Sequence, residues 1–326
     1  MEAGGLSTHT SAGRRASETE KDQVPPVDTR LRHNAFVYSS VDEYVDVSAS
    51  FLRAGLELGE GAVVANTRDG LAVMREALGE LSSAVRFVDV GEAYTRPART
   101  LAAYHRVYAD ELARAGSLRA VADVQFGPDP GEWDLWTGYE AVFTRSFEHL
   151  PAWVLCSYDA SGIPGPVLDG VWRTHPEVLS EGAWNESGTY DADHRPERQA
   201  AGRGPLEGAQ DLAGADDVER WREQLVRRMH EHGLPDSKVL DLVLAANEVL
   251  DNAVTHGGGI KVVRTGRAAG RFACEVVDHG TGFDDPTAGY LAPRSGRGGG
   301  LWVVRQLTWE LDFVHTPDGF AARITA

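Results

Sequence analysis

Between residues 33 and 182, short apolar runs alternate with longer amphipathic stretches. The apolar runs predict β-strands at 35–38, 62–65, 85–90, 119–124 and 153–158. The stretches between them predict helices near 41–57, 69–80, 98–115, 137–149 and 165–173. Short apolar strands that alternate with helices are typical of a parallel sheet covered on both faces. The pattern therefore predicts an open α/β domain, whose ligands bind beyond the carboxyl ends of the strands.

A pattern of helical period follows between residues 239 and 256. Its apolar side is Val239, Val243, Ala246, Leu250, Ala253 and Val254. Glu248, Asn252 and His256 are spaced four residues apart, so they line one face of the helix. A carboxylate, a carboxamide and an imidazole above a packed back fit the floor of a nucleotide site. Taken alone, this pattern is equally typical of an ordinary surface helix with polar residues on its exposed side.

The residues after this helix favour the nucleotide site. The apolar runs 260–263 and 272–277 predict two strands, and the second leads into Asp278-His-Gly-Thr-Gly-Phe283. A carboxylate at the end of a strand, followed by glycines, can accept hydrogen bonds from the amine of a planar base. The run Ser295-Gly-Arg-Gly-Gly-Gly-Leu301 then opens a predicted helix at 302–307. Glycines at a helix N-terminus offer N–H groups and the positive end of the helix dipole to an anion.

These three blocks resemble the N box, the D-x-G-x-G box and the G-x-G-L box of Bergerat-type (GHKL) ATP-binding domains. The resemblance covers residues 205–326 and is greatest to the anti-sigma-factor serine/threonine kinases of bacterial partner-switching systems. It implies an α/β sandwich with helices on one face of a mixed sheet. It also implies ATP and Mg²⁺ as cofactors.

Carried over by position, the resemblance makes Glu248 the general base, Asn252 the Mg²⁺ ligand and Asp278 the carboxylate that binds adenine. The residues that shape the adenine and phosphate walls are Gly280, Gly282, Gly298, Gly299, Gly300 and Leu301. A single carboxamide oxygen suits Mg²⁺, which takes one or two protein ligands and the rest from phosphates and water. One turn away, Glu248 can accept the proton of a serine or threonine hydroxyl.

Two further residues have open roles. His256 is a candidate phosphate contact, but it equally fits a cap at the helix C-terminus, where the dipole favours a cation. Arg297 lies in the glycine loop that should cover the triphosphate, and a contact with phosphate or with a partner protein is favoured there over a purely solvated role.

The region 33–182 resembles the MEDS sensory domain, which occurs in regulators of methanogens and methylotrophs. The motifs that carry the resemblance are His33-Asn-Ala-Phe-Val-Tyr, Phe51-Leu-Arg-Ala-Gly-Leu-Glu-Leu-Gly-Glu, Tyr139-Glu, Leu155-Cys-Ser-Tyr-Asp and Thr174-His-Pro. The resemblance implies a RecA-like fold without a working phosphate loop. Residues 55–61 agree, because they contain no Gly-Lys-Ser/Thr to hold a triphosphate.

A sensory domain implies a small-molecule ligand, which the sequence does not identify. The polar candidates for its site are His33, Cys156, Tyr158, Asp159 and His175. Cys156 ends an apolar strand and fits a small core residue, and His175 before a proline fits the cap of a turn. His and Cys can hold a metal or a haem, but no spacing here requires one.

Composition limits the other function classes. The formal net charge is −17, from 49 acidic residues against 32 Lys plus Arg, which argues against nucleic acid and anionic membranes as partners. The two cysteines, Cys156 and Cys274, lie far apart without metal-ligand spacing, as expected of a reduced cytoplasmic protein. No apolar run approaches the ~20 residues that span a bilayer, and the first thirty residues lack the apolar core of a signal peptide.

Composition also indicates the domain boundaries. Residues 1–32 are polar and predict a disordered tail. The segment 183–210 holds few large apolar residues and no periodicity, which predicts a linker. The expected order is therefore a tail, a sensory domain at 33–182, a linker and an ATPase domain at 211–326.

The resemblance to anti-sigma kinases implies a protein serine/threonine kinase that doubles as an anti-sigma factor. Its partners would be a sigma factor and an antagonist of the anti-sigma factor, which it phosphorylates, and the sensory domain would bias the switch. Kinases of this type commonly form homodimers, for which the sequence locates no interface. Two alternatives remain open: a sensor histidine kinase, and a nucleotide-binding switch without catalysis.

The sensor kinase requires a two-helix hairpin that carries an acceptor histidine before the ATPase domain. The sequence predicts only one helix there, at 217–232, and the candidate acceptors are His194, His230 and His232.

Overall fold

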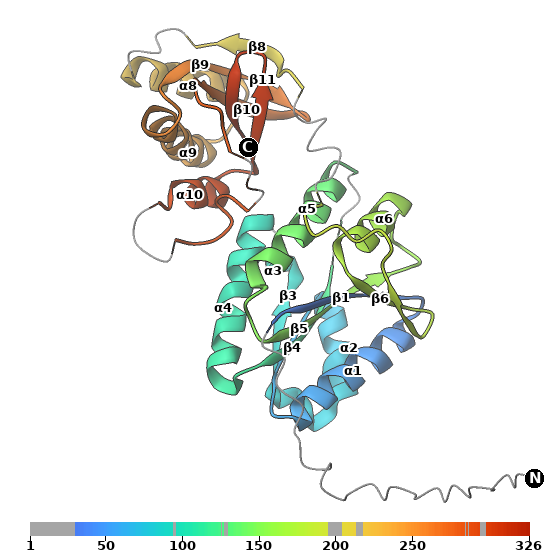
Figure 1. Cartoon of the computed structure of the whole chain (residues 1–326). Helices are drawn as coiled ribbons and strands as arrows, with labels where there is room; N and C mark the ends of the chain where they lie inside the picture. Colours follow the sequence, from blue (N-terminus) through green and yellow to red (C-terminus); the bar gives the residue numbers. More distant parts are fainter. Residues whose placement is uncertain are drawn as a thin grey trace, which may run out of the picture.

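The computed structural model describes residues 30–93, 96–124, 126, 130–194, 204–212, 218–283, 285, 287–293 and 298–326. It contains two sheets, one in each half of the chain, and each sheet has its own helices (Figure 1). Of the tail expected at 1–32, residues 1–29 lie outside the described part. Among the described helices, none combines the length and the apolar character needed to cross a bilayer.

The sheet of the N-terminal half has the strand order β3-β2-β4-β5-β1-β6-β7. Its strands are β1 (Arg32–Tyr38), β2 (Gly61–Asn66), β3 (Val85–Asp89), β4 (Leu118–Asp123), β5 (Ala152–Asp159), β6 (Glu177–Ser180) and β7 (Ala183–Glu186). The first six strands pair in parallel, and β7 pairs antiparallel with β6. All five strands that the sequence predicts in this half are present.

Helices cover both faces of this sheet. They are α1 (Val41–Glu57), α2 (Arg68–Leu78), α3 (Val90–Ala93), α4 (Pro97–Ala115), α5 (Pro130–Phe147) and α6 (Gly165–Thr174), with the 3-10 helix η1 (Gly79–Ala84) after α2. Successive side chains of a strand point to opposite faces. In β5, Val154 and Cys156 belong to the core formed with α4, α5 and α6, whereas Leu155 belongs to the core formed with α1 and α2. The predicted open α/β architecture is confirmed.

The linker prediction for 183–210 was wrong at both ends. β7 occupies its start, and β8 (Glu207–Asp211) occupies its end. Every residue of both strands is exposed, so neither shows the apolar alternation by which a strand is recognised. Backbone hydrogen bonds hold each strand at the edge of a sheet, β7 against β6 and β8 against β9 (Ile260–Ala268).

The sheet of the C-terminal half has the order β11-β12-β10-β9-β8. Its other strands are β10 (Arg271–Asp278), β11 (Glu310–Thr316) and β12 (Gly319–Thr325). Its described pairings are all antiparallel, where the family resemblance led us to expect a mixed sheet. The helices α8 (Val218–Glu231), α9 (Asp236–Thr255) and α10 (Gly300–Leu307) share one core with this sheet, which confirms the predicted layering.

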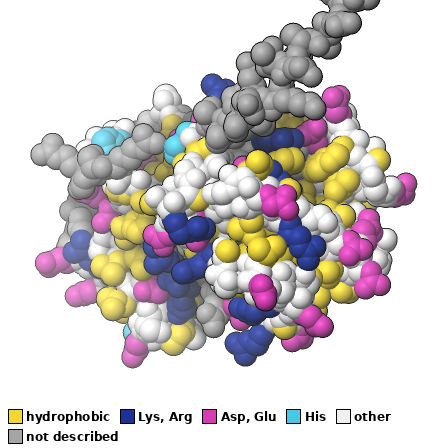
Figure 2. Space-filling model, turned by 90° about the horizontal axis from the view of Figure 1, so that it is seen from below, with side chains coloured by type: hydrophobic (Ala, Val, Ile, Leu, Met, Phe, Trp, Pro, Cys, Tyr) yellow, Lys and Arg dark blue, Asp and Glu magenta, His cyan; other side chains and the backbone are white. Residues whose placement is uncertain are grey.

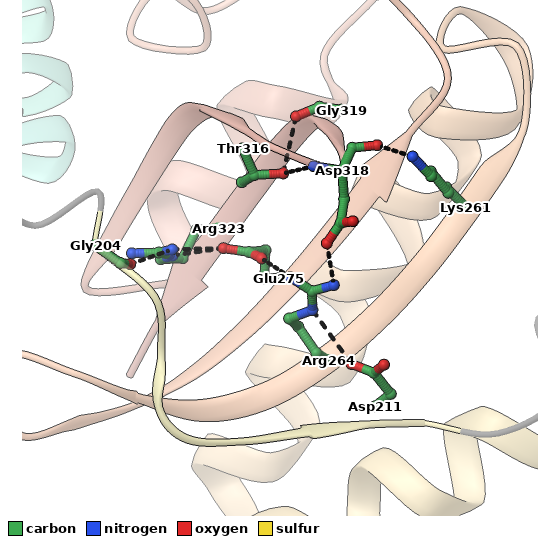
Figure 3. Close-up of polar contacts among 9 residues, drawn as sticks. All are labelled: Gly204, Asp211, Lys261, Arg264, Glu275, Thr316, Asp318, Gly319 and Arg323. Carbon is green, nitrogen blue, oxygen red and sulfur yellow. Dashed lines mark hydrogen bonds and ion pairs between the residues drawn. The ribbon is translucent and has the colours of Figure 1, made fainter.

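The face of this sheet away from the helices holds a buried ion pair (Figure 3). Glu275 of β10 and Arg323 of β12 are opposite each other in register, and their side chains are only 2% and 3% exposed. Arg323 Nε donates to Glu275 Oε2 at 3.0 Å, and Arg323 also donates to the carbonyl of Gly204. Arg264 of β9 approaches the other oxygen of Glu275 at 3.4 Å. Charged contacts therefore link three neighbouring strands.

One residue of the predicted apolar stripe on α9 is placed differently. The buried stripe is Val239, Leu242, Ala245, Ala246, Val249, Leu250 and Ala253. Val254, expected on the packed side, is 59% exposed. It lies roughly a third of a turn around the helix from the middle of the buried stripe, which takes it away from the sheet.

The surface of the molecule carries charges of both signs. In the view of Figure 2, basic side chains lie next to acidic ones on the visible face. Acidic residues outnumber basic ones in the sequence, which gives the net charge of −17.

Candidate nucleotide site

A cavity of about 280 Å³ lies between α9 and the C-terminal sheet. It is lined by Val249, Asn252, Ala253, His256, Gly257, Val276, Asp278, Gly280, Thr281, Gly282, Phe283, Leu301, Phe313, Phe320 and Ala322. These residues come from α9, from the end of β10 and the loop after it, from the start of α10 and from β11 and β12. The three sequence blocks thus meet in one cavity with mostly apolar walls and a few polar groups, as is typical of small-molecule sites.

Asp278, the last residue of β10, is held in place by glycine backbone. The Gly280 N–H donates to Asp278 Oδ1 at 2.8 Å. On the other side, a Cβ atom on Gly257 would lie 2.3 Å from Asp278 Oδ2, so a larger residue there would displace the carboxylate. The carboxylate is therefore fixed in orientation while it lines the cavity, which suits an acceptor for the amine of a purine.

Aromatic rings form the wall beyond Asp278. Phe313 and Phe320 lie nearly parallel, with an interplanar angle of 9° and centroids 5.9 Å apart, and Phe283 packs against both. Gly282 has a φ of +74° and touches Phe320 so closely that a Cβ atom would lie 2.2 Å from its ring. These rings offer a flat apolar surface to a planar base.

Glu248 and Asn252 face the start of α10. A Cβ atom on Gly300 would lie 2.6 Å from Glu248 Oε2 and 3.7 Å from Asn252 Nδ2. Asn252 Nδ2 is buried and has no hydrogen-bond partner among the described residues. Because the oxygen and nitrogen of a carboxamide exchange places by a half-turn of the group, the Asn252 oxygen fits this position as a single Mg²⁺ ligand.

The N-terminus of α10 carries no side-chain cap. Gly299 is its N-cap residue, and the first backbone bond of the helix runs from Val303 N–H to the Gly299 carbonyl at 2.9 Å. The N–H groups of residues 300–302, Leu301 among them, therefore make no bond within the helix. Gly298, with a φ of +82°, makes the turn into this end. Such a terminus fits a phosphate.

Of the two residues with open roles, the structure describes His256 but not Arg297. His256 is the C-cap residue of α9 and also lines the cavity, so its position is compatible with both interpretations. Arg297 lies outside the described residues.

The opposite end of α10 contacts the N-terminal domain. Arg96, just before α4, donates from Nη1 to the carbonyls of Leu307 and Thr308 at 3.0 and 2.9 Å. Arg99 Nε donates to the Gln306 carbonyl at 2.9 Å. Cations at the C-terminal carbonyls of a helix are stabilised by its dipole. One helix thus joins the candidate nucleotide site at its N-terminus to the other domain at its C-terminus.

The polar candidates in the N-terminal domain fall into two groups. Tyr158 and Asp159 line a cavity of about 620 Å³ at the carboxyl ends of the strands, as expected for an open α/β sheet. Tyr38 lines it as well, and burial together with the charges of Asp123 and Asp159 raises its pKa. This tyrosine therefore stays a neutral hydroxyl at neutral pH.

The second group is buried between the sheet and α5. His33, Cys156 and His175 lie together there with Glu140, a residue to which the sequence analysis gave no role. Burial is the main cause of their altered acidity: it lowers the pKa of both imidazoles to about 3, raises that of Glu140 to about 7 and raises that of the thiol.

Comparison with protein families agrees with both halves of the fold. Residues 32–176 match the family model of the MEDS domain, the methanogen/methylotroph, DcmR sensory domain. Residues 212–326 match that of the histidine kinase-like ATPase domain. No curated protein matches the chain. The chain is therefore a fusion of a MEDS sensory domain with a histidine kinase-like ATPase domain, which is the organisation of a signalling regulator.

Proposed function

We propose that this chain is an ATP- and Mg²⁺-dependent protein serine/threonine kinase that also acts as an anti-sigma factor. The observation that carries the proposal is the position of Glu248. Its carboxylate lies one helical turn from Asn252 and against Gly300, where α10 begins. A base at this point lies close to both the proposed metal ligand and the proposed phosphate site.

The remaining residues of the cavity position the nucleotide in this proposal. Asp278 accepts a hydrogen bond from the adenine amine, and the ring of Phe320 packs against the base. The N-terminus of α10 binds the phosphates through its free N–H groups. Asn252 would hold Mg²⁺, which when bound neutralises charge on the phosphates.

Glu248 acts on the protein substrate. It accepts the proton of an incoming serine or threonine hydroxyl as that oxygen attacks the terminal phosphate of ATP, whose bond to the leaving diphosphate breaks. The substrate is the unphosphorylated antagonist of the anti-sigma factor. Its binding releases the sigma factor that the kinase otherwise holds, and its phosphorylation ends that release.

The contact between α4 and α10 supports control by the sensory domain. Arg96 and Arg99 bind the last carbonyls of the helix whose other end forms the phosphate site. A ligand that shifts α4 therefore changes the position of α10. Through α10 the change reaches both nucleotide binding and the surface around it.

The alternative of a sensor histidine kinase has less support. The α8 helix buries Trp221, Leu225 and Met229 in the core of the ATPase domain, so it is not free to form half of a dimerisation hairpin. His230 and His232 are already paired, the first with Asp236 and the second with the Arg228 carbonyl.

Radioactive ATP separates these functions. The purified chain is incubated with γ-labelled ATP, Mg²⁺ and candidate antagonists from the same cell, and the products are treated with acid. Acid-stable phosphate on the antagonist is the expected result. Acid-labile phosphate on the chain itself would establish the histidine kinase, and nucleotide binding without any transfer would leave a switch that only binds.

A further inference from the structure

A cluster of four ionisable side chains is buried in the sensory domain, far from solvent. His33 comes from β1, Glu140 from α5, Cys156 from β5, and His175 directly follows α6. One donor atom of each lies within 4.8 Å of those of the other three. All four residues are at most 3% exposed. We refer to them as the buried cluster.

The donor atoms of the buried cluster lie close to one another. His33 Nε2 lies 3.2 Å from Cys156 Sγ and 3.4 Å from Glu140 Oε2. Glu140 Oε2 lies 3.8 Å from Cys156 Sγ and 3.9 Å from His175 Nε2. Two ligands of a tetrahedral zinc ion, with bonds of about 2.0 to 2.3 Å, are about 3.3 to 3.8 Å apart. The four separations above, from 3.2 to 3.9 Å, are already close to this spacing.

Hydrogen bonds outside the buried cluster fix which nitrogen of each imidazole carries the proton. His175 Nδ1 lies 3.0 Å from the Val171 carbonyl, which can only accept, so Nδ1 is the donor. Thr144 Oγ1 donates to the Glu140 carbonyl and accepts from His33 Nδ1 at 2.8 Å. In both neutral rings the lone pair is therefore on Nε2, which points into the buried cluster. Partners of this kind orient the histidine ligands of metal sites.

Two polar atoms of the buried cluster lack hydrogen-bond partners. Among the described residues, His175 Nε2 and Glu140 Oε1 are buried without any hydrogen bond. Two imidazole lone pairs and a carboxylate that face each other in an apolar core offer acceptors but few donors. Buried polar groups are normally satisfied, so these unpartnered atoms favour a positive centre among the four side chains.

We propose that the buried cluster binds one divalent transition-metal ion of the zinc class. Its ligands are Nε2 of His33 and His175, a carboxylate oxygen of Glu140 and the thiolate of Cys156, whose proton is released on binding. Nitrogen and sulfur donors select such a metal over Mg²⁺ or Ca²⁺, which prefer oxygen. Four protein ligands complete a tetrahedron, so the ion ties α5 and the end of α6 to the middle of the sheet.

The sequence offers a matched control for the test. Cys274, the other cysteine, is equally buried but lies in the ATPase core. Elemental analysis of the full chain, purified without chelators, should find about one zinc per chain in the wild type and in Cys274→Ala. Cys156→Ala and Glu140→Gln should each retain less than about a tenth of that amount, since even second-shell changes cost ten- to a hundredfold in affinity.

A spectroscopic measurement keeps the proposal testable if a variant is poorly folded. The wild-type chain is stripped with a chelator and titrated with Co²⁺, which gives thiolate-to-metal charge-transfer absorption only when sulfur is a ligand. The band should saturate at one equivalent in the wild type and in Cys274→Ala, and it should be lost in Cys156→Ala. A wild type without zinc and without this band, or a band that persists in Cys156→Ala, would overturn the proposal.

Discussion

Gly257, just after α9, and Asp278, at the end of β10, are in such close contact that a Cβ atom on the glycine would lie 2.3 Å from Asp278 Oδ2. The two residues belong to different sequence blocks, and their contact determines where the carboxylate lies in the cavity. The position of the proposed adenine acceptor thus depends on a residue that carries no functional group.

Gly257→Ala should displace this carboxylate and weaken ATP binding about tenfold or more, which corresponds to about 1.4 kcal/mol. Calorimetry with ATP and Mg²⁺ measures the dissociation constant. Gly162→Ala is the control, because a Cβ atom there meets nothing within 4 Å and the residue lies in the other domain. Equal affinity in Gly257→Ala and the wild type would show that the contact does not position Asp278.

Glu248→Ala should leave ATP bound and reduce phosphate transfer about a hundredfold or more, the usual contribution of a general base. The test compares nucleotide affinity with the initial rate of antagonist phosphorylation. Asp251→Ala is a control on the same helix, since Asp251 is exposed and, unlike Glu248, is not among the nearest atoms to Gly300. Transfer at the wild-type rate in Glu248→Ala would remove the carboxylate from the mechanism.

Arg96→Ala should loosen α10. The guanidinium makes two hydrogen bonds to the last carbonyls of that helix, and bonds from a charged donor contribute about 1.5–3 kcal/mol each. Hydrogen exchange of the α10 amides should accelerate about tenfold or more. Arg106→Ala, at an exposed position of α4, should leave the exchange unchanged. Identical protection in both variants would mean that α4 does not support α10.

Glu275→Leu should destabilise the ATPase domain by about 3–5 kcal/mol, because it leaves Arg323 buried without its carboxylate. In the double variant Glu275→Leu with Arg323→Leu, no charge remains uncompensated and most of this loss should be regained. Thermal unfolding of the two variants tests the difference. A double variant no more stable than the single one would contradict a dominant role for the lost Arg323–Glu275 pair.

The sequence predicted the parts of the fold in which short apolar runs alternate with amphipathic stretches. The strands of the N-terminal sheet stand out because their apolar side chains lie between amphipathic helices. β7 and β8 could not be recognised, since all their side chains are exposed and only backbone bonds to neighbouring strands make them strands. Such pairing is a tertiary effect that local composition does not record.

The candidate nucleotide site and the buried cluster also differ in how far the sequence predicted them. Glu248, Asn252 and Asp278 stand in short motifs, so the sequence could name them. The structure brings Asn252 and Asp278 to one cavity and places Glu248 beside Gly300, one helical turn from Asn252. The buried cluster takes one ligand from each of four separate elements, with no local spacing to indicate it. The parallel register places Ala35 beside Cys156 and hence His33 two residues away, and the packing of α5 and α6 on the sheet adds Glu140 and His175.

The most direct test of the account is a calorimetric titration of the full chain with ATP and Mg²⁺, compared with the same titration of Asp278→Asn. A hydrogen bond to a charged group contributes about 1.5–3 kcal/mol, so the account predicts binding by the wild type and an affinity about ten- to a hundredfold lower in the variant. No binding by the wild type, or an unchanged affinity in Asp278→Asn, would contradict it.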